Sequence, residues 1–186
     1  CVTKQEKSDK YSFDLQGHRG CRGLMPENSL VAFQKAIELD VNTLELDLAV
    51  SADSQLVVSH EPWFSASICT DSLDNPIAEE NDKQLNIHAH TYAQVKKYDC
   101  GSKGNARFPN QQKSAQVKPL LKEVIDLAKK YAKEQNKSLP YFNIEIKSNP
   151  EGDGLYHPSP AIFSDLVHRF LKDNLPLEKY NVQSFD

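Results

Sequence analysis

The chain has 186 residues, of which 39% are hydrophobic and 26% are charged, a composition that is ordinary for a globular domain with one sizeable core. The 26 acidic and 22 basic residues give a net charge of -4, and no long basic run is present, which argues against nucleic acid as a partner. No apolar stretch approaches the roughly 20 residues of a membrane span.

The first twelve residues are polar and rich in lysine, which predicts an N-terminal tether over residues 1–12. The chain begins with Cys1 rather than methionine, as a bacterial lipoprotein does after cleavage before its lipid-carrying cysteine. We therefore expect a lipid anchor at Cys1 and an extracytoplasmic location, periplasmic or tethered to a membrane, with an arbitrary processing site as the alternative. In an oxidising compartment Cys69 and Cys100 could form a disulfide and leave Cys21 over; otherwise all three are small buried side chains.

Local patterns after the tether predict three strands and a helix in the first part of the domain. Leucines that alternate with Glu45 and Asp47 indicate a half-buried strand, and Asn28 or Ser29 can cap the helix before it. The predicted elements, in chain order, are a strand at 13–18, a helix that starts near 30, a strand at 43–50 and a short strand at 56–59.

The next stretch, residues 61–116, is polar and rich in proline, and it predicts an insertion of loops with one short helix near 91–98. Regular patterns then return. They predict a helix at 119–135, a strand at 141–147, an amphipathic helix around 162–170 and a last strand at 181–186.

Strands alternate with helices in this series, which predicts an α/β fold with parallel strands. Five strands are expected, with the insertion after the third. An eight-stranded barrel typically takes about 250 residues. The pattern therefore predicts either an open sheet or the N-terminal part of a longer barrel.

Acidic and basic side chains share one face of two predicted strands. Glu45 and Asp47 are two residues apart, as are Glu145 and Lys147, so each pair points to one side of its strand. A solvated acidic face with a cross-strand salt bridge is the simpler explanation. Both faces of a parallel sheet are usually covered, however, so the carboxylates would converge in a barrel or cleft and need a counter-ion. Oxygen ligands alone suit Mg²⁺ or Ca²⁺.

Two histidines, His18 and His60, lie at the carboxyl ends of predicted strands, where α/β folds build their sites. Two imidazoles can act as general base and general acid near neutral pH. Arg19 and Lys147 add positive charge that suits a phosphate. Together with a metal, these groups indicate phosphodiester cleavage. Four further histidines lack such a setting: His88, His90, His157 and His168. Of these, His88 and His90 lie in the loop-rich insertion and are expected to be exposed.

Four motifs in this order and spacing make the chain resemble the glycerophosphodiester phosphodiesterase family. They are HRG at 18–20, PENS at 26–29, ELDLAVSADSQLVVSHE at 45–61 and NIEIKS at 143–148. The similarity implies a TIM-type (β/α)8 barrel over residues 13–186, of which the chain covers about the first five strands. It also implies hydrolysis of a glycerophosphodiester to glycerol 3-phosphate and an alcohol.

Carried over residue by residue, the resemblance assigns a role to each motif residue. It implies His18 and His60 as the catalytic pair. The implied cofactor is one divalent cation, Ca²⁺ or Mg²⁺. The resemblance does not indicate an oligomeric state. The implied metal ligands are Glu45, Asp47 and Glu145, and the implied phosphate or substrate contacts are Arg19, Lys147 and Glu27.

One segment departs from the family pattern, in which Asp usually follows the second histidine and precedes an Arg/Thr-rich stretch. Here Glu61-Pro62-Trp63-Phe64 follows His60, and this changes the expected alcohol pocket. Two alternatives stay open: a phospholipase-like lyase on the same fold, in which an internal hydroxyl is the nucleophile, and a non-catalytic metal-binding fragment.

Overall fold

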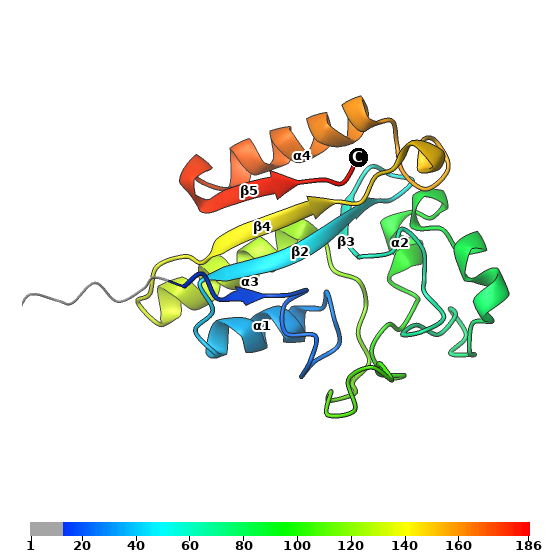
Figure 1. The fold of residues 1–186 in the computed structure, drawn as a ribbon, viewed down its shortest axis with the longest axis horizontal. Coiled ribbons are helices and arrows are strands. Elements are labelled where there is room, and N and C mark those ends of the chain that lie inside the picture. The colour runs from blue at the N-terminus through cyan, green and yellow to red at the C-terminus, as the bar shows by residue number, and fades with distance from the viewer. Residues whose placement is uncertain (1–12) are drawn as a thin grey trace, which may run out of the picture.

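A single five-stranded sheet with helices packed against it forms the scaffold (Figure 1). The computed structural model describes residues 13–186, so the expected tether and the anchor at Cys1 lie outside the described residues. The strands are β1 (Gln16–Gly17), β2 (Thr43–Val50), β3 (Leu56–Val58), β4 (Tyr141–Ile146) and β5 (Tyr180–Gln183). The α-helices are α1 (Leu30–Glu38), α2 (Tyr92–Val95), α3 (Leu121–Glu134) and α4 (Pro160–Asn174). Short 3-10 helices occupy Glu79–Gln84, Ile87–Ala89, Pro150–Gly152 and Leu177–Lys179.

Four of the strands are parallel neighbours in the order β1-β2-β4-β5. Helix α1 connects β1 to β2, α3 precedes β4, and α4 connects β4 to β5. Strands that add in sequence order through helical crossovers are the arrangement of a TIM-type barrel. The predicted α/β class and the TIM-type topology are therefore confirmed for this part of a barrel.

The third strand corrects the expectation of five parallel strands. Strand β3 runs antiparallel to β2, with Leu48 opposite Val58 and Val50 opposite Leu56. Only residues 51–55 join the two strands, whereas a parallel crossover needs a dozen residues or more. The chain therefore turns back on itself as a hairpin, and β3 adds no further parallel strand.

The first helix begins where the sequence predicts. The side-chain oxygen of Ser29 accepts a hydrogen bond from Ala32 N at 3.3 Å, so Ser29 rather than Asn28 is the N-cap. Buried residues of α1, α3 and α4 pack against the leucines of β2 and the apolar residues of β4. This apolar layer leaves the opposite face of the sheet for polar side chains.

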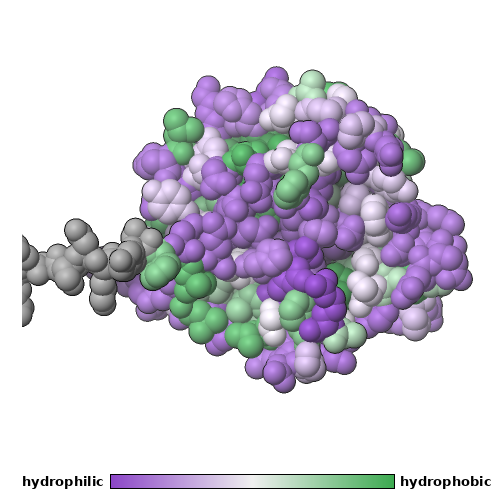
Figure 2. All heavy atoms as spheres, viewed as in Figure 1, coloured by the Kyte–Doolittle hydropathy of each residue, from purple (hydrophilic) through white to green (hydrophobic). Residues whose placement is uncertain are grey.

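The opposite face of the sheet carries a ladder of amides. Asn143 Nδ2 donates to Gln16 Oε1 at 3.0 Å, and Asn181 Nδ2 donates to Asn143 Oδ1 at 2.6 Å. The surface in Figure 2, drawn in the same view as Figure 1, is largely hydrophilic. In the part of the chain that the structure describes, no helix has the length and apolar character that a membrane span needs.

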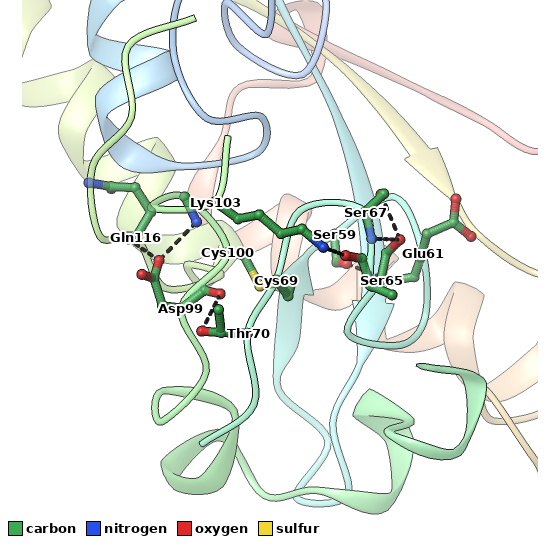
Figure 3. The surroundings of a disulfide bond; sticks show 12 residues. Ser59, Glu61, Ser65, Ser67, Cys69, Thr70, Asp99, Cys100, Lys103 and Gln116 are labelled. Atoms are coloured by element: carbon green, nitrogen blue, oxygen red, sulfur yellow. Dashed lines mark hydrogen bonds between the residues drawn. A yellow bond between two sulfur atoms is a disulfide. The ribbon is translucent and has the colours of Figure 1, made fainter. Parts of the chain in front are cut away.

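The insertion has a hydrophobic core of its own, which the sequence did not indicate. Turns and short helices make up most of it, as predicted, and α2 is shorter than the helix expected at 91–98. Phe64 stacks on Tyr98 with ring centroids 3.7 Å apart, and Cys69 and Cys100 form a disulfide beside them (Figure 3). Cys21 is a free thiol, so the predicted pairing is confirmed.

Candidate active site

Three carboxylates meet on the polar face of the sheet. Glu45 and Asp47 project from β2 and Glu145 from β4, and the parallel register places Asp47 directly beside Glu145. All three residues are buried, and one oxygen atom from each lies within 4.8 Å of the others. The predicted convergence of the acidic residues is therefore present in the fold.

Burial and mutual repulsion make this cluster unfavourable without a cation. Burial, and next the charge of Asp47, raise the pKa of Glu45 to about 7 from its ordinary 4.5. The backbone N–H of Arg19 opposes this shift, because it donates to Glu45 Oε2 at 2.6 Å. A cation bound by the three carboxylates would favour their ionised forms.

Two basic side chains border the cluster. Arg19 Nε lies 3.5 Å from Asp47 Oδ2, and its NH1 donates to Glu27 Oε1 at 2.6 Å. Lys147 Nζ donates to Glu145 Oε1 at 2.5 Å and lies 3.6 Å from Asp47 Oδ1. Arg19 and Lys147 are thus anchored by the same carboxylates that form the cluster, so they present fixed positive charge next to it.

Asn28 is a site residue that the sequence analysis considered only as a helix cap. Its Nδ2 donates to Asp47 Oδ2 at 2.9 Å, and its backbone adopts a left-handed conformation with φ 52°. Its Oδ1 is buried and has no hydrogen-bond partner among the described residues. A free amide oxygen beside three carboxylates completes an oxygen-only donor set, so the residues present fit a hard divalent cation.

His18 lies at the edge of the cluster. Its Nε2 is 3.9 Å from Glu45 Oε2, and its side chain is 59% exposed. Burial of its ring, and next the charges of Arg19 and Arg22, lower the pKa of His18 below its ordinary value of 6.5. An accessible imidazole that is neutral at pH 7 can accept a proton.

His60 reaches the cluster through the hairpin. Strand β3 runs back along β2, and Ser59 N donates to Asp47 O at 2.9 Å. The expectation that His60 ends a parallel strand is therefore wrong, because the hairpin brings its segment to the level of Asp47. Its Nδ1 is 2.8 Å from Glu61 Oε1, and this hydrogen bond is the first cause of a lowered pKa of Glu61. The contact fixes the orientation of the ring.

The remaining histidines lie outside the cluster. His88 and His90 are half-buried rather than exposed, because their Nδ1 atoms contact Val50 O at 3.1 Å and Asn86 O at 2.7 Å. His157 is buried, and its Nε2 accepts from Asn149 N at 3.2 Å. These contacts give the three residues structural roles, and the expectation that His88 and His90 are exposed is wrong.

One large cavity lies away from these residues. Its volume is about 740 Å³, and it lies near the amino ends of β2 and β4, where Asn42, Thr43 and Tyr141 contribute to its wall. None of the predicted site residues lines it. Because sites of α/β barrels lie at the opposite, carboxyl ends of the strands, we base the functional argument on the acidic cluster.

The fold and the cluster together define a TIM-type α/β protein with a candidate metal centre on its sheet. The sequence profile of the Glycerophosphoryl diester phosphodiesterase family matches residues 18–173, and the chain belongs to this family. The match includes both histidines, the three carboxylates and the two basic residues described above.

Individual relatives agree with the family match. A glycerophosphodiester phosphodiesterase of Bacillus subtilis (strain 168) is 30% identical over 175 residues, which cover 90% of this chain and 50% of the relative. A second relative of that name, from Caldanaerobacter subterraneus subsp. tengcongensis, is 29% identical, and the match covers 91% of this chain and 56% of the relative. The chain thus spans about half the length of these relatives.

Solved structures share the fold. A crystal structure from Silicibacter pomeroyi DSS-3 has a TM-score of 0.78 and 29% identity, and the match covers 92% of this chain and 57% of that chain. An Oleispira antarctica phosphodiesterase in complex with its product sn-glycerol-3-phosphate has a TM-score of 0.63 and 21% identity, with coverage of 92% and 57%. At that identity the second structure supports the fold alone.

Proposed function

We propose that this chain carries the catalytic residues of a metal-dependent enzyme that hydrolyses glycerophosphodiesters to glycerol 3-phosphate and an alcohol. The observation that carries the proposal is the meeting of Glu45, Asp47 and Glu145 on one face of the sheet, in a chain of this family. The two relatives named glycerophosphodiester phosphodiesterase, at 30% and 29% identity, support this substrate class.

The carboxylates Glu45, Asp47 and Glu145 would hold one Ca²⁺ or Mg²⁺, with Asn28 Oδ1 as a further oxygen donor. Such a cation supplies Lewis acidity toward phosphoryl oxygens when it is bound. The three carboxylates alone would repel a phosphodiester, so the cation and the basic side chains around it also make the site attractive to the substrate.

The two basic residues would bind the phosphate. Arg19 is oriented by Glu27 and Lys147 by Glu145, and both point their charge toward the cluster. Positive groups that are already in place stabilise charge that develops on the phosphoryl oxygens, because they need no reorganisation. Glu27 in this account positions Arg19, which agrees with its implied place in the substrate site.

The histidines would move the protons. One imidazole takes a proton from the attacking water, and the other gives one to the leaving alkoxide. The contact between His60 Nδ1 and Glu61 Oε1 orients the His60 ring, while His18, with its lowered pKa, is available in the neutral form.

An extracytoplasmic location is part of this proposal. The disulfide between Cys69 and Cys100 supports an oxidising compartment, because such bonds are rare in the cytosol. Lipid attachment at Cys1 would hold the enzyme at a membrane surface. Labelling of the full-length protein with a radioactive fatty acid tests the anchor, and Cys1→Ser is expected to abolish the label.

The test of the function is release of glycerol 3-phosphate from glycerophosphocholine by the full-length protein, with and without chelator. We expect activity that chelation removes, that Mg²⁺ or Ca²⁺ restores, and that His18→Ala lowers about 10²-fold or more. Activity that survives both chelation and His18→Ala would refute the proposal. A cyclic phosphate product would instead identify the lyase alternative, and metal binding without turnover would identify a non-catalytic module.

A further inference from the structure

Lys118 is a buried lysine that the proposed mechanism does not use. Only 6% of its surface is exposed, and among the described residues its ammonium has neither a hydrogen-bond nor an ion-pair partner. Lys118 Nζ is not among the fully buried atoms that lack a partner, so the ammonium reaches solvent and its three N–H donors are available to a ligand. A partner from outside the chain would satisfy these donors.

The backbone places Lys118 beside His60. Leu120 forms an antiparallel bridge with Val57, and Val58 N donates to Pro119 O at 2.8 Å. Continued by two residues, this register puts Lys118 opposite Ser59, the residue that binds Asp47 O. The Tyr92 hydroxyl also donates to the carbonyl of Lys118 at 3.4 Å, which holds the segment from the insertion side.

The charges around Lys118 are those of the candidate active site. Glu27, Glu61 and Asp47 attract its charge and Arg19 repels it, while burial, the largest effect, lowers the pKa of Lys118 to about 8. The side chain is therefore mostly protonated at neutral pH.

The neighbouring carboxylates are already engaged with other partners. Glu27 accepts from Arg19 at 2.6 Å, and Glu61 contacts His60 at 2.8 Å. Asp47 accepts from Asn28 at 2.9 Å. Lys118 therefore contributes positive charge on the His60 side of the site that no carboxylate pairs with directly.

We propose that Lys118 contacts the head group of the substrate and selects neutral polyol alcohols over quaternary ammonium alcohols. A polyol offers hydroxyl oxygens that accept hydrogen bonds from the ammonium, whereas choline offers a positive charge that the ammonium repels. The inference rests on the proposed function and specifies its alcohol.

Trp63, an aromatic residue close to His60 in the sequence, is not available to bind a quaternary ammonium group. Quaternary ammonium groups are usually recognised by the faces of aromatic rings. Trp63 follows His60 by three residues, but Lys83 lies 5.3 Å from the centroid of its ring and Tyr156 packs at 5.3 Å. Trp63 is therefore already occupied by a cation of the chain itself.

The experiment compares glycerophosphoglycerol, which has a neutral polyol head group, with glycerophosphocholine as substrates of the full-length protein. We expect the wild type to have the higher kcat/KM for glycerophosphoglycerol. Lys118→Met keeps the length and burial of the side chain without its charge, and it is expected to reduce the ratio of the two kcat/KM values at least about tenfold, or about 1.4 kcal/mol. Lys118→Arg keeps the charge and should keep the preference. Lys122→Met, at an exposed lysine paired with Asp126, is the matched control.

Each outcome separates the inference from the proposed function. A wild type that hydrolyses neither substrate refutes the proposed function. If the wild type hydrolyses both substrates and Lys118→Met leaves the ratio of their kcat/KM values unchanged, the inference alone is overturned. An equal loss of kcat/KM on both substrates leads to the same conclusion, because it places Lys118 against the glycerol phosphate that both substrates share. Circular dichroism of each variant checks that it is folded.

Discussion

The strongest quantitative prediction concerns the pH dependence of stability that Glu45 creates. Its pKa is about 7 in the folded protein against 4.5 for the ordinary group, so the folded state binds this proton more tightly than the unfolded state does. The stability from this proton is present below about pH 4.5 and is lost as the pH rises toward 7. At about 1.4 kcal/mol per pH unit, the loss above pH 7 is about 3 kcal/mol.

Glu45→Gln should remove this loss, because glutamine keeps the shape of the side chain and carries no charge. In the presence of chelator, the wild type is expected to lose about 3 kcal/mol relative to Glu45→Gln between pH 4.5 and pH 8. Urea unfolding of both proteins at the two pH values measures the difference, and other titrating groups largely cancel in it. Glu134→Gln, at an exposed position of α3, is the control and should follow the wild type.

Metal addition gives the second half of the same experiment. At pH 8, Mg²⁺ or Ca²⁺ should raise the unfolding midpoint of the wild type, because a ligand that binds only the folded state stabilises it. The same cation should act less on Glu45→Gln, which lacks one charged ligand. If the difference in stability between the chelated wild type and Glu45→Gln is the same at both pH values, burial and the charge of Asp47 do not raise the pKa of Glu45.

Two further predictions concern the scaffold. Replacement of both disulfide cysteines, Cys69→Ala with Cys100→Ala, should lower the free energy of unfolding by about 4 kcal/mol, since the bond closes a loop of 31 residues. The control is Cys21→Ala, which removes a free thiol. A loss below about 1 kcal/mol in the double variant would contradict a stabilising role of the bond. Ser29→Ala should cost about 1 kcal/mol through the lost cap of α1, which thermal unfolding detects. Ser29→Thr keeps the hydroxyl that also donates to Pro26 O, and it should keep the cap.

The parts of the fold that repeat locally were predictable from the sequence. The alternation of leucines with Glu45 and Asp47 identified β2 and both of its faces, and the same argument identified β4. Alternation put the acidic residues of each strand on one face, and the resemblance to the family implied that the two strands share one metal site. The register that sets Asp47 beside Glu145 came only from the fold. The residues that form the cluster could therefore be named before the structure.

The features that were missed depend on contacts between distant segments. Phe64 and Tyr98 pack across 34 residues of polar sequence, where no periodic pattern marks a core. Lys118 lies in the same kind of stretch, and only its pairing with the segment after β3 brings it to the site. The antiparallel direction of β3, in contrast, could have been predicted from the sequence, because the five residues between β2 and β3 are too few for a parallel crossover.

The antiparallel return of β3 explains how His60 comes to lie beside the metal ligands. A parallel crossover would have carried the chain back to the other end of the sheet, whereas the hairpin retraces β2 from Val50 to the level of Asp47. There Ser59 N binds Asp47 O, so the backbone of the proposed catalytic histidine is tied to that of a proposed metal ligand. The segment that carries Lys118 then pairs with the outer side of β3. The two ends of the insertion therefore deliver His60 and Lys118 to the same site, and Tyr92 within the insertion holds the Lys118 segment by its hydrogen bond to the Lys118 carbonyl.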